Sequence, residues 1–115
     1  MEANTVALSG ALSEIEPLRY TPAGIPLLHF RILHRSRQLE AGFKREVECE
    51  MSGIAMGEVA VAMARLKPGQ QVRVGGFLNR KNRMSTQLVL HTIEVQELKE
   101  DGHGTGKSRH LQGQG

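Results

Sequence analysis

Basic side chains are the most informative functional groups in this sequence. A guanidinium group binds a phosphate through two parallel hydrogen bonds, and a row of cations attracts a polyanion. The formal net charge is only +3, so the distribution of charge matters more than its total. The basic residues of interest fall into two segments, the first with Arg19, Arg31, Arg35, Arg37, Lys44 and Arg45, the second with Arg80, Lys81 and Arg83.

Aromatic side chains could add stacking contacts with the bases of a nucleic acid. They are scarce, with one tyrosine, three phenylalanines and no tryptophan. Phe30 is in phase with apolar neighbours and is expected in the core. Phe43 follows Gly42 at the end of an expected loop and should be exposed, whereas Tyr20 could take either role. With so few stacking groups, ionic contacts would supply most of the affinity.

The sequence contains no recognisable set of catalytic or metal-binding residues. It has no Cys-x-x-Cys pair, no Gly-x-x-x-x-Gly-Lys loop and no Gly-x-Ser-x-Gly elbow. Glu46, Glu48 and Glu50 would share one strand face, which provides no two carboxyl groups in different environments. Cys49 alternates with them, in phase with apolar neighbours, and is expected to be buried. We therefore expect a binding protein with no catalytic residue, metal ligand or cofactor.

Two features bear on where the protein works. A single cysteine excludes an internal disulfide and is typical of a reducing compartment. The N-terminal residues show no positively charged segment with an apolar run behind it, and no stretch approaches the roughly 20 apolar residues that cross a bilayer. We expect a cytoplasmic protein with no membrane partner.

Period-two alternation of apolar and polar residues predicts the elements that must position these groups. Five strands are expected, over residues 5–13 (continuing, bent, to Tyr20), 27–37, 44–51, 70–77 and 85–98. Gly10 marks a bend in the first strand. A projecting loop is expected at 38–43 and a basic loop at 79–83. Both sides of the last strand are partly apolar, which would suit a subunit interface.

One helix and a tail complete the expected organisation. Val59, Met63 and Leu66 lie at i, i+4 and i+7 in an alanine-rich segment over 57–66, which favours a short helix. Glycine alternates with polar residues towards the C-terminus, which is typical of a disordered tail. We therefore expect one domain over 1–98 and a tail over 99–115. Three strands, a helix and two strands follow the order of the OB-fold, an all-β, five-stranded Greek-key barrel.

The OB-fold would bring the two basic segments together. Its second and third strands and the loop between its fourth and fifth strands line one binding face. Nine of the fifteen Lys and Arg residues lie on these elements or beside them, so a phosphate track is one interpretation. The other is that the strand arginines only solvate an exposed face, and the residues alone leave the two open.

Blocks distributed along the chain resemble the primosomal replication protein N (PriB) family. They are Leu8-Ser9-Gly10, residues 22–26, His34-Arg35-Ser36, residues 40–43 and Val89-Leu90-His91. The resemblance covers residues 4–98. It implies an OB-fold homodimer, related to bacterial single-stranded DNA-binding protein, that binds single-stranded DNA without catalytic activity. It also implies that the protein stimulates a restart helicase and helps the primosome to assemble during replication restart.

The resemblance also indicates site residues by position. Phe43, Arg35 and Arg45 match an aromatic and two basic residues on the family's DNA face, and residues 80–83 match a basic loop. Taken with the charge pattern, the expected DNA-binding residues are Arg19, Tyr20, Arg31, Arg35, Phe43, Lys44, Arg45, Arg80, Lys81 and Arg83.

Glu48 departs from the family pattern, which has a tryptophan at this position. A stacking surface becomes a negative charge, with Glu46 and Glu50 on the same face. We expect weaker DNA binding than in members with the tryptophan, or a track shifted towards Arg19, Arg31 and the last loop. Two alternatives stay open. One is a protein-interaction adaptor with weak DNA binding, and the other is a general single-stranded DNA-binding protein.

Overall fold

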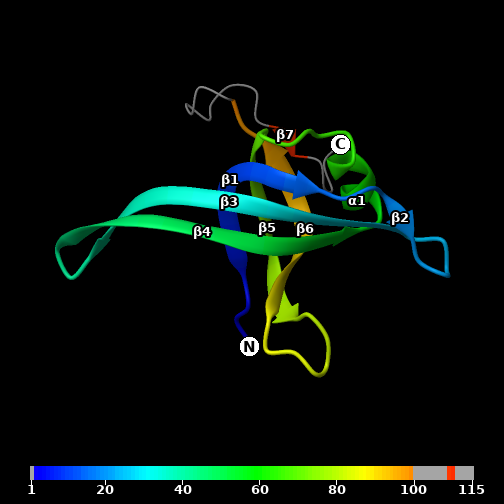
Figure 1. Ribbon diagram of the computed structural model, residues 1–115, viewed down its shortest axis with the longest axis horizontal. Coiled ribbons are helices and arrows are strands. Elements are labelled where there is room, and N and C mark those ends of the chain that lie inside the picture. The colour runs from blue at the N-terminus through cyan, green and yellow to red at the C-terminus, as the bar shows by residue number, and fades with distance from the viewer. Residues whose placement is uncertain (1, 100–108, 111–115) are drawn as a thin grey trace.

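The elements follow the expected order, with additional short strands. The computed structural model describes residues 2–99 and the backbone of residues 109–110 (Figure 1). The elements are β1 (Val6–Ile15), β2 (Arg19–Tyr20), β3 (Pro26–Glu40), β4 (Phe43–Met56), α1 (Glu58–Met63), β5 (Gln71–Arg80), β6 (Leu88–Glu97) and β7 (Arg109–His110).

Five of the strands close into a barrel. The hydrogen-bonded order is β1-β5-β6-β4-β3, and β3 pairs back to β1. All neighbours are antiparallel except β4 and β6, which run parallel. The helix α1 lies between β4 and β5 in the chain. This arrangement confirms the expected all-β OB-fold with one short helix after the third long strand.

The first strand serves two neighbours because it bends. β1 pairs with β5 over Val6–Ala11 and with β3 from Ala11 onwards, and its register shifts between Leu12 and Glu14. A Cβ atom at Gly10 would overlap the carbonyl oxygen of Leu33, so only glycine lets β3 approach this closely. The irregularity expected at Gly10 lies a little later in β1, between Leu12 and Glu14, and the pairing through Gly10 itself is regular.

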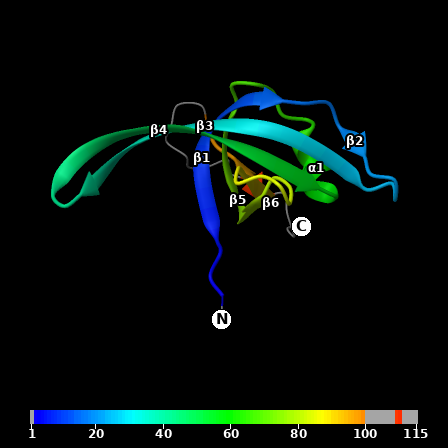
Figure 2. The same ribbon diagram turned by 60° about the horizontal axis from the view of Figure 1, so that its bottom comes forward.

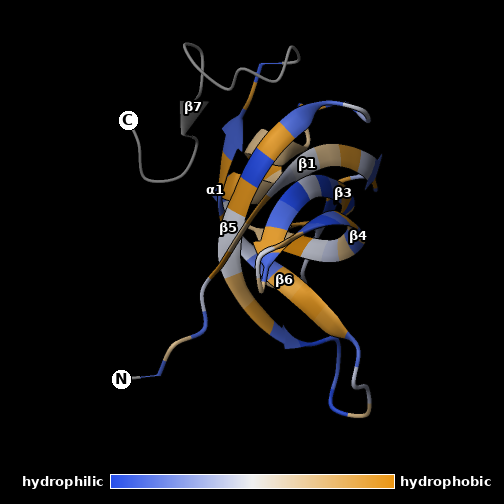
Figure 3. Ribbon diagram, turned by 90° about the vertical axis from the view of Figure 1, so that its left-hand side faces the viewer, coloured by the Kyte–Doolittle hydropathy of each residue, from blue (hydrophilic) through white to orange (hydrophobic). Residues whose placement is uncertain are grey.

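The core fills the barrel and extends beneath α1. Leu28, Phe30 and Ile32 of β3 are at most 2% exposed, which confirms the predicted inward side of this strand. The expected helix face is also buried, with Val59, Met63 and Leu66 in the same cluster. Figure 3 shows the alternation of hydrophobic and hydrophilic residues along the strands. Burial of these side chains is the main source of stability for such a barrel.

The loop expected at 38–43 is wrong, because β3 and β4 stay paired up to Glu40 and Phe43. Ala41 and Gly42 form the turn, with φ angles of 52° and 83°, as a tight two-residue hairpin requires. We call residues 34–49 the arm, because this part of the ribbon extends beyond the pairing with β1 and β6. The arm stands out from the barrel in Figures 1 and 2.

The burial expected for Cys49 is also wrong, since this residue is exposed. Its phase was correctly assigned, because it lies on the strand side that further along β4 includes the buried Ala55. Cys49 belongs to the arm, however, where no second layer covers that side. Whether an inward-phase residue is buried depends on where the barrel ends.

The other boundaries shift by a few residues. β5 continues to Arg80 and β6 begins at Leu88, so the basic loop occupies residues 81–87 rather than 79–83. The tail expected over 99–115 lies mostly outside the described residues and stays a prediction; its residues Arg109 and His110 pair with Glu97 and Gln96 of β6. Within the described part of the chain, no helix has the length and hydrophobicity needed to span a bilayer.

Candidate nucleic-acid interface

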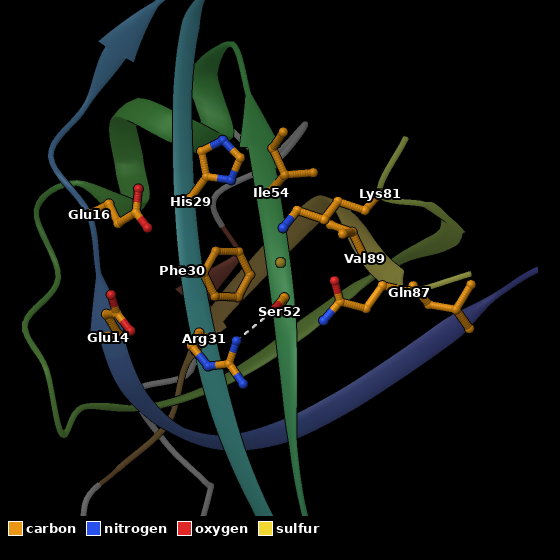
Figure 4. A pocket seen from close by; sticks show the side chains of 12 residues that line it. Glu14, Glu16, His29, Phe30, Arg31, Ser52, Ile54, Lys81, Gln87 and Val89 are labelled. Carbon is orange, nitrogen blue, oxygen red and sulfur yellow. Dashed lines mark hydrogen bonds between the residues drawn. The ribbon is translucent and has the colours of Figure 1, made fainter. Parts of the chain in front are cut away.

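A groove runs over the outer side of β3 and β4, beside the loop that joins β5 to β6. Its volume is about 370 Å³. Figure 4 shows Lys81 approaching it from the loop, while Arg31 and His29 reach it from β3. The groove is lined by Glu14, Glu16, His29, Phe30, Arg31, Ser52, Gly53, Ile54, Lys81, Gln87, Leu88 and Val89.

Three cross-strand ion pairs extend from the groove along the arm, and we call them the ladder. Arg35 pairs with Glu48 at 3.3 Å, and Arg37 pairs with Glu46 at 3.2 Å. Arg31 reaches Glu50 at 3.2 Å. Side chains that face one another across antiparallel strands attract in this way when their charges are opposite. The ladder arginines therefore carry carboxylate partners before any phosphate arrives.

Glu50 connects the base of the ladder to the barrel. It accepts hydrogen bonds from the guanidinium of Arg31 and from the Ser13 hydroxyl of β1, the latter at 2.7 Å. These bonds favour the ionised carboxylate, so they lower the pKa of Glu50, with Arg31 as the larger cause. The same hydrogen bond raises the pKa of Arg31, which also donates to the Ser52 hydroxyl at 2.7 Å.

The cations of the loop over residues 81–87 differ from the ladder arginines in their ion pairing. Lys81 and Arg83 have no salt-bridge partner among the described residues. The loop keeps its shape through its own hydrogen bonds. The backbone N–H of Lys81 donates to the Gln87 carbonyl at 2.8 Å, and that of Met84 donates to the Asn82 side chain at 2.9 Å. Arg80 donates to the carbonyl of Arg83 at 3.1 Å.

The exposed aromatics sit far from one another. Phe43 is 68% exposed at the end of the arm, and Tyr20 is 63% exposed on β2, whereas Phe30 is buried as expected. Tyr20 pairs with Pro26 and Phe43 pairs with Glu40. Those positions are fourteen residues apart on β3, or about 45 Å at 3.3 Å per residue. One short strand of nucleic acid could not contact both within a single compact site.

Alternation along the arm also separates residues that are adjacent in sequence. Arg35 and Lys44 project from the ladder side, whereas Phe43 and Arg45 project from the opposite side. Arg45 forms a 3.3 Å salt bridge with Glu40 on its own side. The structure thus brings Arg31 and Lys81 into one groove, and Arg80 and Arg83 lie in or beside the same loop. It places Arg19 and Tyr20 at one end of β3, and Phe43, Lys44 and Arg45 at the other.

Several groove residues carried no sequence signal. Ser52, His29 and Gln87 line the groove with hydrogen-bonding groups, and Glu14 and Glu16 add two carboxylates. They come from four separate segments, so only the three-dimensional pairing brings them together. Within the described residues, no group of His, Cys, Asp and Glu has the arrangement of a metal site.

Comparisons with known proteins give a consistent result. A family model described as "Another single-strand binding protein family" matches residues 4–94. A protein named replication restart protein PriB from Nitrosomonas europaea is 43% identical over 92 residues, covering 80% of this chain and 85% of the relative. The PriB protein of Bordetella pertussis is 35% identical over 95 residues, covering 83% and 89%.

Solved structures agree with these sequence matches. The structure of PriB from Ralstonia solanacearum aligns with a TM-score of 0.76 at 31% identity, over 84% of this chain and 98% of that one. The single-stranded DNA-binding protein of Thermus aquaticus aligns with a TM-score of 0.71 at 26% identity, over 87% of this chain and 52% of that one.

Proposed function

The chain belongs to the PriB family, related to single-strand binding proteins, and from this premise we propose that it binds single-stranded DNA during replication restart. As a member of this family it is a binding protein and not an enzyme. The observation that carries the proposal is the groove, where Lys81 of the loop and Arg31 of β3 converge beside the apolar side chains of Ile54 and Val89. Strand-tracking cations beside apolar or aromatic surface are what single-strand binding requires.

The groove and the loop would make different contacts with the bound strand. Among the described residues Lys81 and Arg83 have no carboxylate partner, so they can neutralise phosphates without first breaking an ion pair of that part of the chain. Arg31 and Arg35 would first have to leave Glu50 and Glu48. Ile54 and Val89 offer apolar surface to bases inside the groove. We therefore propose that the loop supplies most of the ionic affinity, and that Arg19, Tyr20, Phe43 and Arg45 act only when a longer strand is bound.

The finer role is that of a primosome accessory protein. We propose that the chain assists replication restart in the cytoplasm by stimulating a restart helicase and helping other primosome proteins to assemble. The support is the replication-restart name of the curated relatives, together with a groove that suits the single strand such a helicase uses.

The homodimer implied by the family stays a proposal, and the open edge of β1 supports it. Residues 6–8 pair with β5 on one side. On their other side the described residues provide no strand, because pairing with β3 begins at Ala11. An open strand edge can pair with the same edge of a second copy. Such pairing would extend the sheet across the two copies.

Fluorescence anisotropy of a labelled single-stranded oligonucleotide and of its duplex, at low salt, tests the proposal. We expect binding to the single strand and much weaker binding to the duplex, whose bases are not available for the groove. A protein that binds neither would contradict the proposal and favour the adaptor alternative, in which the same face docks a protein. Adding the cognate restart helicase to that experiment would then be the next step.

A further inference from the structure

A second hollow lies on the barrel wall between β4, β5, β6 and the start of α1, and it adjoins the groove at Ile54. Its volume is about 520 Å³. Large apolar side chains border it while remaining open to solvent: Phe77 is 39% exposed, Met56 46% and Ile93 50%. The rings of Phe77 and His91 stack with centroids 5.0 Å apart and planes 3° apart. A cluster of this kind on a small domain indicates a contact surface.

The lining of this hollow includes one carboxylate, Glu58, and neither lysine nor arginine; Arg65 lines the neighbouring hollow on the other side of Glu58. The Glu94 side chain lies over Gly75, two residues before Phe77 on the same strand face. Neither carboxylate has a salt-bridge partner in the part of the chain that the structure describes. Arg73 is four residues from Phe77 on β5, about 13 Å at 3.3 Å per residue, and two residues from Gly75, about 7 Å, so this cation lies nearer to Glu94 than to the hollow. Phosphates would meet repulsion here, so the hollow suits an apolar group carried beside a cation.

The tip of the arm carries that combination. Leu39 is 73% exposed and faces Lys44 directly across the ribbon. Lys44 has no salt-bridge partner among the described residues. The tip cannot reach the hollow of its own chain, because Lys44 and Met56 are twelve residues apart on one strand, about 40 Å along it, and the arm extends away from the barrel (Figure 1). Only the tip of a second copy could enter it.

We propose that the arm tip of one copy docks into the Phe77–Ile93 hollow of the next, with Leu39 inside and Lys44 beside Glu58 and Glu94. The two surfaces differ, so the contact is head-to-tail and can continue from copy to copy. It is small and hence weak, and it becomes effective when copies are held close together on one strand. It leaves the loop cations and the edge of β1 free, and Ile54 is the residue that borders both the hollow and the groove.

The test uses one variant for each surface. Leu39→Ser removes the apolar tip, and Ile93→Asp places a charge in the hollow. Ile25→Ser, at an apolar residue that is 42% exposed between β2 and β3 and outside both surfaces and the basic loop, is the matched control. Sedimentation velocity at rising concentration should show that wild type and Ile25→Ser form assemblies larger than the species seen at low concentration, while neither surface variant alone does so. Circular dichroism confirms that the variants are folded.

Mixing the two surface variants provides the decisive part of this experiment. Leu39→Ser keeps an intact hollow and Ile93→Asp keeps an intact tip, so an equimolar mixture should regain growth. If Leu39→Ser grew like wild type while Ile93→Asp did not, the hollows would be contacting each other and the proposal would be overturned. Absence of growth for wild type, both free and on a long single strand, would overturn it as well.

Measurements of DNA binding distinguish this inference from the proposed function. The docking of copies held on one DNA strand rests on that function. We expect wild type to bind a long single strand about tenfold more tightly per site than a short one. Both surface variants should lose that advantage while keeping the short-strand affinity. If wild type did not bind the short strand at all, that result would instead count against the proposed function.

Discussion

The barrel half and the arm half of the β3–β4 ribbon are one pair of strands in two environments. In the barrel half, Leu28, Phe30 and Ile32 are at most 2% exposed, and Gly53 and Ala55 face them. In the arm half, the side chains of the Arg35–Glu48 and Arg37–Glu46 pairs are 61–82% exposed. The backbone pairing is continuous through both halves.

The difference separates stability from function. Each buried side chain of the barrel half contributes about 1.5–3 kcal/mol through burial, whereas an exposed ion pair contributes about 0.2–1 kcal/mol. The arm can therefore change its side chains with little effect on folding. Its residues are free to serve a ligand, and the ladder determines how much positive charge that ligand meets.

The largest expected effect comes from the barrel half. Phe30→Ala should lower the free energy of unfolding by about 3–5 kcal/mol, because it removes a buried ring and leaves a cavity. Urea denaturation measures this, and Ile32→Val, at about 0.5–1.5 kcal/mol, serves if the first variant does not fold. A loss below 1 kcal/mol for a folded Phe30→Ala would show that the barrel half is not the stable part.

A gain of affinity is expected from the arm. Glu48→Trp frees Arg35 from its carboxylate and adds a surface on which bases stack, worth about 1–3 kcal/mol per base. Single-strand affinity measured by anisotropy should rise accordingly. Glu48→Gln frees the arginine without adding a ring, so it should give a smaller rise. Unchanged affinity in Glu48→Trp would contradict the idea that this carboxylate limits binding.

The ladder itself should contribute little to folding. Arg37→Ala removes one pair whose side chains are 79% and 82% exposed. The expected loss of unfolding free energy is below about 1 kcal/mol, measured by the same urea titration. A loss as large as that of Phe30→Ala would remove the distinction between the two halves.

Acid should lower the stability of the junction between the barrel half and the arm half. The pKa of Glu50 is lowered in the folded protein by Arg31 and Ser13, so its ionised form favours folding. That contribution is present above the ordinary pKa of a glutamate and is lost as the pH falls through the lowered folded-state pKa. The thermal midpoint of wild type should therefore fall more than that of Glu50→Gln between pH 7 and pH 3. Parallel pH profiles for the two proteins would contradict this role.

Sequence patterns predicted the barrel better than the site. Alternation identified the inward side of β3 because that side is buried along most of the domain. The same alternation could not show where the barrel ends, so Cys49 was assigned to a core that does not reach it. Ala41–Gly42 carries no strong hairpin signal, and the arm was taken for a loop. The ladder and the Phe77–His91 stack depend on strand register, which a single sequence does not reveal.

The salt dependence of single-strand binding tests most directly the claim that the loop, rather than the ladder, supplies the ionic affinity. Three double variants remove the same charge: Lys81→Ala/Arg83→Ala in the loop, Arg35→Ala/Arg37→Ala in the ladder and Arg65→Ala/Lys67→Ala beyond α1 as the control. Each lost phosphate contact lowers the slope of log affinity against log salt by about 0.7. We predict a reduction of about 1.4 for the loop variant, with less for the ladder variant and none for the control. A full reduction in the ladder variant, with the loop variant unchanged, would contradict the account.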